Sequence, residues 1–393
     1  MRYTKKMLAV AVAGAIAAPA SVAMAQSSTV QIGGSLTFLY YVHDPKNNTA
    51  RKTDILEGSE PQLVIRGSEK LGGGLTAWFQ CASSFDLWGG NGDEGFCSRN
   101  SALGFRGSWG NVFAGNWDSP HKLIYNQARG AFSGTNALYG GTASLLFGGS
   151  ASGADNTENP ERFYRRQARS FSYHSPSWNG FTVNGMYSSG GPERTAMGGS
   201  PLDPRMYSFA AAYRTGPLYV GLGYEIHQDW NPAGAGIGVA QPQNYGGGDD
   251  NNWSIVGVYT FNNAIRLSGV YSKTEYETTN ASSMDVDGYA VYVDWRVQGP
   301  HKVRFQYGTV DDPSGNFGGS VGRYVTSAAA GGLGTGADVF GINYEYAFSK
   351  RTAGLIGYNK MSNDAGARFS LGKANASLGG DQTSMGIAVK HRF

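Results

Sequence analysis

Short and long connections alternate strictly along this chain, and this pattern restricts the possible folds more than any other feature. They separate segments in which apolar and polar residues alternate with a period of two, as in β-strands. The seven short turns lie at 67–74, 108–111, 175–180, 216–217, 262–263, 298–300 and 348–350. The eight long connections lie near 43–61, 82–98, 118–167, 188–205, 228–251, 273–286, 311–336 and 360–381. A soluble β-sandwich has no reason to sort its connections by length, whereas a membrane barrel has short turns at one end and long loops at the other.

The alternating segments number sixteen, and an even number is what an up-and-down barrel requires. They span 30–42, 62–66, 75–81, 99–107, 112–117, 168–174, 181–187, 206–215, 218–227, 252–261, 264–272, 287–296, 301–310, 337–347, 351–359 and 382–393. We therefore predict an all-β fold, a 16-stranded antiparallel up-and-down transmembrane β-barrel. Its short turns would face the periplasm and its long loops the outside.

The charged face of each segment indicates which side of the barrel faces water. In 289–297 the odd-numbered residues are aromatic or aliphatic, whereas Asp294 and Arg296 lie on the opposite face. A barrel of sixteen strands is too wide for side chains to fill and encloses an aqueous channel. The apolar face must then contact lipid, and closure pairs every backbone group within the bilayer. No run of 18 apolar residues follows residue 26, so we expect no transmembrane helix.

The first 25 residues resemble a secretory leader. A basic start at Arg2, Lys5 and Lys6 precedes an apolar run, and Ala23-Met24-Ala25 is a small-residue cleavage site. We predict a cleaved signal peptide at 1–25 and a single barrel domain at 26–393. Removing the three basic residues of the leader leaves 29 basic and 29 acidic residues. The overall charge therefore gives no support for nucleic-acid binding.

Several segments resemble Gram-negative general porins of the betaproteobacterial type. Residues 63–80 are similar to the second and third strands of these porins, 99–116 to the fourth and fifth, and 170–181 to the sixth strand and its turn. The resemblance implies a homotrimer of sixteen-stranded barrels in the bacterial outer membrane, in contact with its lipid and lipopolysaccharide. It also implies a third loop folded inward to narrow the pore, and 118–167 lies where that loop should be. The terminal Phe393 resembles the signal that the outer-membrane assembly machinery recognises.

Basic residues dominate the predicted constriction. By alternation Arg66, Arg106 and Arg166 face the lumen, and the resemblance implies wall arginines at these positions; a register slip would replace Arg166 by a neighbour such as Arg162. Residues 119–154 contain no Asp or Glu. The constriction set that we predict is Arg66, Arg106, Arg166, Arg162, Arg129, Lys122 and Asp118, with Arg296, Lys302 and Arg304 as further lumen charges. Fixed positive charge in a narrow channel concentrates anions. We expect an anion-preferring pore for passive diffusion of small hydrophilic solutes.

The two cysteines and six histidines suggest no catalysis. Cys81 and Cys97 flank the second long loop, and in an oxidising exported compartment we expect them to form a disulfide. The histidines are isolated, and none lies in a metal motif such as HExxH. We therefore predict no enzyme activity, no metal and no cofactor.

Three alternatives stay open at this point. A substrate-specific channel would show saturable block by one solute, an outer-membrane hydrolase would show activity in purified protein, and a surface adhesin would lose attachment when its loops are deleted. The acidic pairs Asp249-Asp250 and Asp311-Asp312 lie in long loops. They could bind divalent cations or lipopolysaccharide, although solvated acids are the simpler interpretation.

Overall fold

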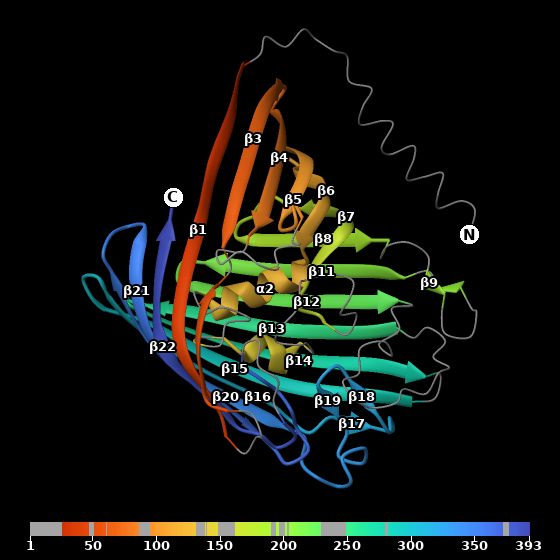
Figure 1. The fold of residues 1–393 in the computed structure, drawn as a ribbon. Coiled ribbons are helices and arrows are strands. Elements are labelled where there is room, and N and C mark those ends of the chain that lie inside the picture. Colours follow the sequence, from red (N-terminus) through yellow and green to blue (C-terminus); the bar gives the residue numbers. More distant parts are fainter. Residues whose placement is uncertain are drawn as a thin grey trace.

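The computed structural model describes most of the chain as a strongly twisted ring of strands (Figure 1). The described residues are 26–46, 51–59, 61–85, 95–130, 138, 140–147, 162–189, 194–195, 201–202, 204–228, 249–279, 282–371 and 377–393. The predicted signal peptide at 1–25 lies outside them, so its cleavage stays a prediction.

All sixteen predicted strands are present, and each long strand pairs antiparallel with its neighbours in the chain. They are β1 (Gln26–Pro45), β3 (Gln62–Gly72), β4 (Leu75–Ser84), β5 (Ser101–Gly107), β6 (Gly110–Asp118), β7 (Arg166–His174), β8 (Phe181–Ser188), β11 (Arg205–Thr215), β12 (Leu218–Gln228), β13 (Asp249–Phe261), β14 (Ile265–Thr279), β15 (Ser282–Gln298), β16 (His301–Val310), β20 (Ala337–Ala347), β21 (Thr352–Asn363) and β22 (Gln382–Arg392).

The remaining elements are short. They are the strands β2 (Thr53–Gly58), β9 (Arg194–Thr195), β10 (Pro201–Leu202), β17 (Ser314–Gly315), β18 (Ser320–Val321) and β19 (Tyr324–Val325), and the helices α2 (Pro120–Arg129) and α3 (Thr142–Leu146). Among the described residues, no helix is long and apolar enough to cross a membrane.

The first long connection is shorter than the sequence indicated. We assigned 43–61 to a loop, but β2 pairs with β1 from Phe38 to His43, beside the stretch of β1 that pairs with β3. The second barrel strand is therefore β2 followed by β3, interrupted near Pro61, which has no N–H to donate to the ladder. The first turn is also tighter than 67–74, because β3 continues to Gly72 and pairs there with Leu75.

The last strand closes the barrel, as predicted. β22 pairs with β1 from Ser35 opposite Arg392 to Pro45 opposite Gln382. The backbone N–H of Phe393 donates to the Gly34 carbonyl at 3.2 Å, and the Gly34 N–H donates back at 3.1 Å. A side chain at Gly34 would meet the Gln62 carbonyl at 2.3 Å and the Phe393 ring at 2.6 Å. Only glycine therefore fits at this closure point, and the ring has no free edge.

The exterior of the barrel is apolar, as the alternation indicated. On β15, Tyr289 and Trp295 are 45% and 44% exposed, whereas Tyr292 between them is fully buried. Val220, Leu222 and Tyr224 on β12 repeat this pattern. An apolar surface of this extent marks contact with lipid in a structure whose charged residues face inward.

Exposed and half-buried aromatic residues gather near both ends of the strands. Tyr346 and Phe348 pack together beside a short turn, with ring centroids 5.2 Å apart. Toward the opposite end, Tyr271 packs against both Trp253 and Tyr289 at 5.1 Å. Two such rows are the aromatic girdles with which a membrane barrel meets the two lipid interfaces.

Candidate pore constriction

The third long connection contains a helix that the sequence analysis did not expect. The Ser119 hydroxyl accepts a hydrogen bond from the Lys122 N–H at 3.2 Å, and Pro120 begins the first turn of α2. The helix ends at Gly130, whose φ of 58° suits glycine. Ser-Pro at the start and Arg-Gly at the end are ordinary helix boundaries, so the signal was available in the sequence.

This connection folds into the barrel, which confirms the predicted inward third loop (Figure 1). Helix α2 packs against β11, β12, β13 and β14, and α3 packs against β15 and β16. The Tyr125 hydroxyl lies 2.9 Å from that of Tyr292 on the wall, and both hydroxyls are 2.7 Å from Thr142 Oγ1. These three buried groups connect both helices of the loop to β15.

Two further contacts hold the loop against the wall. The Gly140 carbonyl accepts hydrogen bonds from Gln306 Nε2 at 2.8 Å and from Asn359 Nδ2 at 2.7 Å. At the start of α2, His121 Nε2 lies 2.8 Å from Ser254 Oγ. Burial lowers the pKa of His121, which therefore stays neutral near pH 7.

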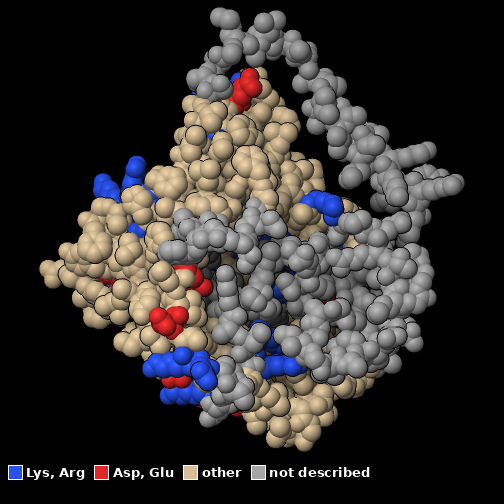
Figure 2. Space-filling view, viewed as in Figure 1, with Lys and Arg blue, Asp and Glu red and all other residues tan. Residues whose placement is uncertain are grey.

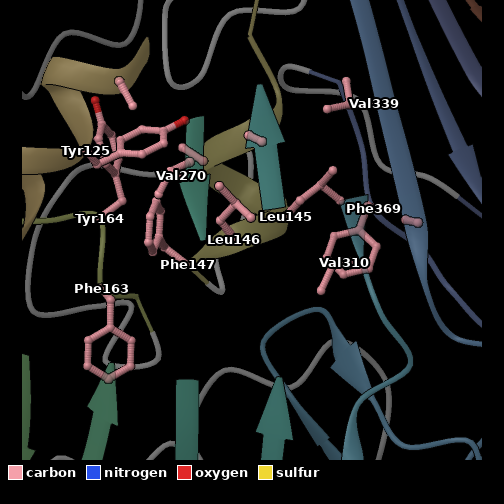
Figure 3. Close-up of a cluster of buried hydrophobic side chains, with 14 of the residues drawn as sticks. Tyr125, Leu145, Leu146, Phe147, Phe163, Tyr164, Val270, Val310, Val339 and Phe369 are labelled. Atoms are coloured by element: carbon pink, nitrogen blue, oxygen red, sulfur yellow. The ribbon is translucent and has the colours of Figure 1, made fainter. Parts of the chain in front are cut away.

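The second part of the loop forms an apolar cluster inside the barrel. Figure 3 shows Leu145 and Leu146 between Phe147 on one side and Phe369 on the other. Phe369 belongs to the connection after β21, and the Tyr324 hydroxyl in the connection before β20 donates to the Leu145 carbonyl. External segments therefore cover the inward loop from above, and this side of the interior is a packed core.

Glycines on the wall make room for the loop. A side chain at Gly308 of β16 would meet Thr142 Cγ2 at 2.8 Å, and one at Gly288 of β15 would meet Leu146 Cδ2 at 2.6 Å. The loop backbone can lie close to the sheet because these positions carry no Cβ.

Three of the predicted constriction residues meet in one ion cluster. Asp118 lies 2.9 Å from Lys122 Nζ and 3.5 Å from Arg166 Nε. Asn100, which the sequence analysis did not single out, donates to Asp118 at 3.0 Å and accepts from Arg166 at 2.6 Å. All three charged residues are less than a tenth exposed. Among the described residues, two cations share one carboxylate here, which is an excess of one positive charge.

Arg129 and Arg162 lie elsewhere on the same loop. Tyr164 lies 4.4 Å from Lys122 Nζ and 5.9 Å from the Arg129 guanidinium, so both cations approach its ring. Arg162 is buried just before β7, and its carbonyl accepts from Arg165 Nη1 at 3.3 Å.

The predicted charges Lys302 and Arg304 belong to a second network along the wall. Arg304 Nε lies 2.9 Å from Asp294 Oδ1, and Glu345 is 2.8 Å from both Arg304 Nη2 and Lys302 Nζ. Asp294 is also 3.5 Å from Arg266, which donates to the carbonyls of Gln127 and Ala128 at the end of α2. The network contains three cations and two carboxylates, so it also has an excess positive charge.

The structure does not bring Arg66, Arg106 or Arg296 into either cluster. Arg66 donates to Gln31 at 2.9 Å, and Arg106 lies opposite Thr76, close to the turn after β5. Arg296 lies opposite Lys302 in the ladder and is exposed. Figure 2 shows basic side chains in the central part of the visible face, and further basic groups toward its edges, the lowest of them beside acidic side chains.

A cavity of about 560 Å³ lies where the end of α2 meets the turns of β11 to β14. Its polar lining includes Gln127, Arg214, Thr260, Asn262, Asn263 and Arg266. Arg214 Nη2 donates to Gln127 Oε1 at 2.8 Å, so the loop and the wall share this cavity. The polar walls and basic side chains suit water and small hydrophilic solutes.

Cys81 and Cys97 form a disulfide, as predicted. It joins the end of β4 to the residues just before β5 and closes the second external connection at its base. Among the described residues, no group of three metal-ligating side chains comes together.

Comparison with known protein families shows to which family the chain belongs. Residues 9–366 match the family model described as Gram-negative porin. The chain belongs to this porin family. The porin is 25% identical to outer membrane porin protein 32 of Delftia acidovorans, over 97% of this chain and 99% of that protein. It is 27% identical to an outer membrane porin protein of Bordetella pertussis, over 84% of this chain and 81% of that one.

Solved structures show the same fold. An anion-selective porin from Comamonas acidovorans superimposes with a TM-score of 0.71 at 20% identity, covering 93% of this porin and 100% of that chain. The trimer form of OmpT from Vibrio cholerae gives a TM-score of 0.64 at 14% identity, covering 94% and 100%. The family and the closed barrel place the porin in the bacterial outer membrane as a passive channel; such proteins act as channels and not as enzymes.

Proposed function

We propose that this porin is an anion-preferring diffusion channel for small hydrophilic solutes. The observation that carries the proposal is the excess of cations over carboxylates, counted among the described residues, in the clusters around Asp118 and around Asp294. Their surplus charge lies beside the inward loop, which in this proposal narrows the aqueous path. The name of the Comamonas structure, an anion-selective porin, agrees with this proposal.

The preference would follow from electrostatics alone. Fixed positive charge between low-dielectric walls raises the local concentration of anions and lowers that of cations. The effect weakens as salt screens the charges, because the Debye length falls from about 10 Å at 0.1 M to about 3 Å at 1 M. We therefore expect selectivity to be strongest in dilute salt.

Reversal potentials across a planar bilayer under a KCl gradient test the proposal. We expect chloride preference in the wild type, weakened in Arg66→Ala and Arg106→Ala because each removes one exposed cation from the lumen side. Arg351→Ala, which removes an exposed arginine from a short turn, is the matched control. Unchanged selectivity in both lumen variants would refute their role, and cation preference in the wild type would refute the proposal.

We also propose that three copies assemble as a homotrimer and that the machinery of outer-membrane assembly recognises Phe393. The trimer form of the similar OmpT structure supports the first point. The exposed ring of Phe393, at the end of the closing strand, supports the second. On a detergent gel we expect an oligomer of three chains that heating converts to monomer. A single band at the monomer mass without heating, from protein that conducts in bilayers, would contradict the trimer.

A further inference from the structure

A group of arginines lies at the outer mouth of the pore, apart from both clusters described above. Arg323 occupies the tight turn between β18 and β19, in the external connection before β20. Arg368 lies in the connection after β21, and Arg162 lies at the end of the inward loop. Three connections that are far apart in the sequence therefore meet here.

The Arg323 side chain is buried, and no carboxylate of the described residues pairs with it. It is 3% exposed, and its Nη1 donates to the Arg368 backbone carbonyl at 2.6 Å. Its Nε and the Nε of Arg368 are both buried and lack a hydrogen-bond partner among the described residues. Its charged neighbours are the guanidinium groups of Arg368 and Arg162.

This arrangement needs a counter-ion. Burial and the two like charges lower the pKa of Arg323 to about 10, which still leaves the guanidinium protonated at neutral pH. Removing a charge from water without pairing it costs free energy, and buried N–H donors without an acceptor add to that cost. An anion that accepted from both free Nε–H groups would relieve both costs.

We propose that Arg323 and Arg368, supported by Arg162, form a binding site for small oxyanions at the outer mouth of this porin. Oxygen acceptors suit the site because guanidinium groups form directed, charge-assisted hydrogen bonds to phosphate and carboxylate. The site would collect oxyanions from outside before they reach the cations beside the inward loop. The inference rests on the proposed anion preference and names a class of solute for it.

The framework of the site is fixed without the anion. The Tyr324 ring packs against Phe369 at 5.7 Å, so the residues that follow Arg323 and Arg368 contact each other directly. Asn363 holds the backbone of Phe369 through hydrogen bonds of 2.8 Å and 2.9 Å. The two arginines therefore project from anchored backbone.

Binding of inorganic phosphate to the purified, detergent-solubilised porin tests the site. We expect saturable broadening of the phosphate ³¹P resonance with the wild type. In Arg323→Gln and Arg368→Gln the half-saturating concentration should rise about tenfold or more, as for the loss of a charge-assisted hydrogen bond. Arg351→Gln, which removes an exposed arginine from a short turn, should bind like the wild type. Two variants at the site keep the test valid if one of them fails to fold.

Other outcomes would overturn the inference. The site would be refuted if the wild type showed no saturable broadening. It would also be refuted if both site variants bound phosphate as tightly as the wild type. Reversal potentials on the same preparations keep the two proposals separate. Chloride preference without phosphate binding refutes the site alone, whereas cation preference refutes the proposed function.

Discussion

Replacing Gly308 with valine, alone or with Gly288→Val, should push the inward loop off the wall and into the open lumen. Thr142 would have to move, because its Cγ2 lies 2.8 Å from the new Cβ position and β-branched side chains have little rotameric freedom. Overpacking of this kind costs about 1–3 kcal/mol. We expect the single-channel conductance to fall and amide exchange in 120–130 and 140–147 to become faster.

Gly257→Val is the matched control for this experiment. Gly257 lies on β13, on the outward face with Ile255 and Tyr259, and a Cβ there meets nothing within 4 Å. It should leave conductance unchanged. If Gly308→Val kept both the conductance and the amide exchange of the wild type, the position of the loop would not depend on glycine at this point of the wall.

Asp294→Asn should both weaken the structure and increase anion preference. Asp294 is the carboxylate shared by Arg266 and Arg304, so its loss leaves Glu345 as the one carboxylate in a network of three cations, Arg266, Arg304 and Lys302. Leaving a buried donor without its partner costs about 1–3 kcal/mol, and more when the donor is charged. The excess charge of the network would rise by one unit. We expect earlier thermal unfolding and a reversal potential shifted further toward that of chloride.

The salt dependence separates the two effects of Asp294→Asn. The shift in reversal potential should shrink in about 1 M KCl, where the Debye length is about 3 Å, while the loss of stability largely persists. Glu69→Gln removes the same charge from an exposed position near the first short turn and should change neither quantity. An unchanged or reversed shift in Asp294→Asn would show that this network does not face the ion path.

At the arginine-rich start of β7, the period-two pattern did not predict which side chains face inward. Arg169 adopts φ 53°, and around it the alternation is broken: Arg165, Arg166 and Gln167 are all buried, whereas Arg169 is exposed. A strict period of two would have put Arg165 and Gln167 outside. A bulge adds a residue to one strand and leaves no reliable mark in the sequence.

The sequence by itself determined the sixteen strands, their order, the closure by the last strand and the apolar exterior. These features follow from local rules, because each strand has one face in lipid and one in water, and every backbone group must be paired. The inward third loop was expected from the resemblance to known porins, although its helix was not. The disulfide was expected from two cysteines in an exported protein.

Only the tertiary structure decided which charges meet. Asp118 and Lys122 are close in the chain, but Arg166 and Asn100 come from other strands, and the Asp294 network joins β14, β15, β16 and β20. Arg323 and Arg368 gave no signal in sequence, since each lies in a polar external connection. Alternation determines the face on which a side chain lies. Its partners depend on register, bulges and the path of the folded loops, which only the closed barrel fixes.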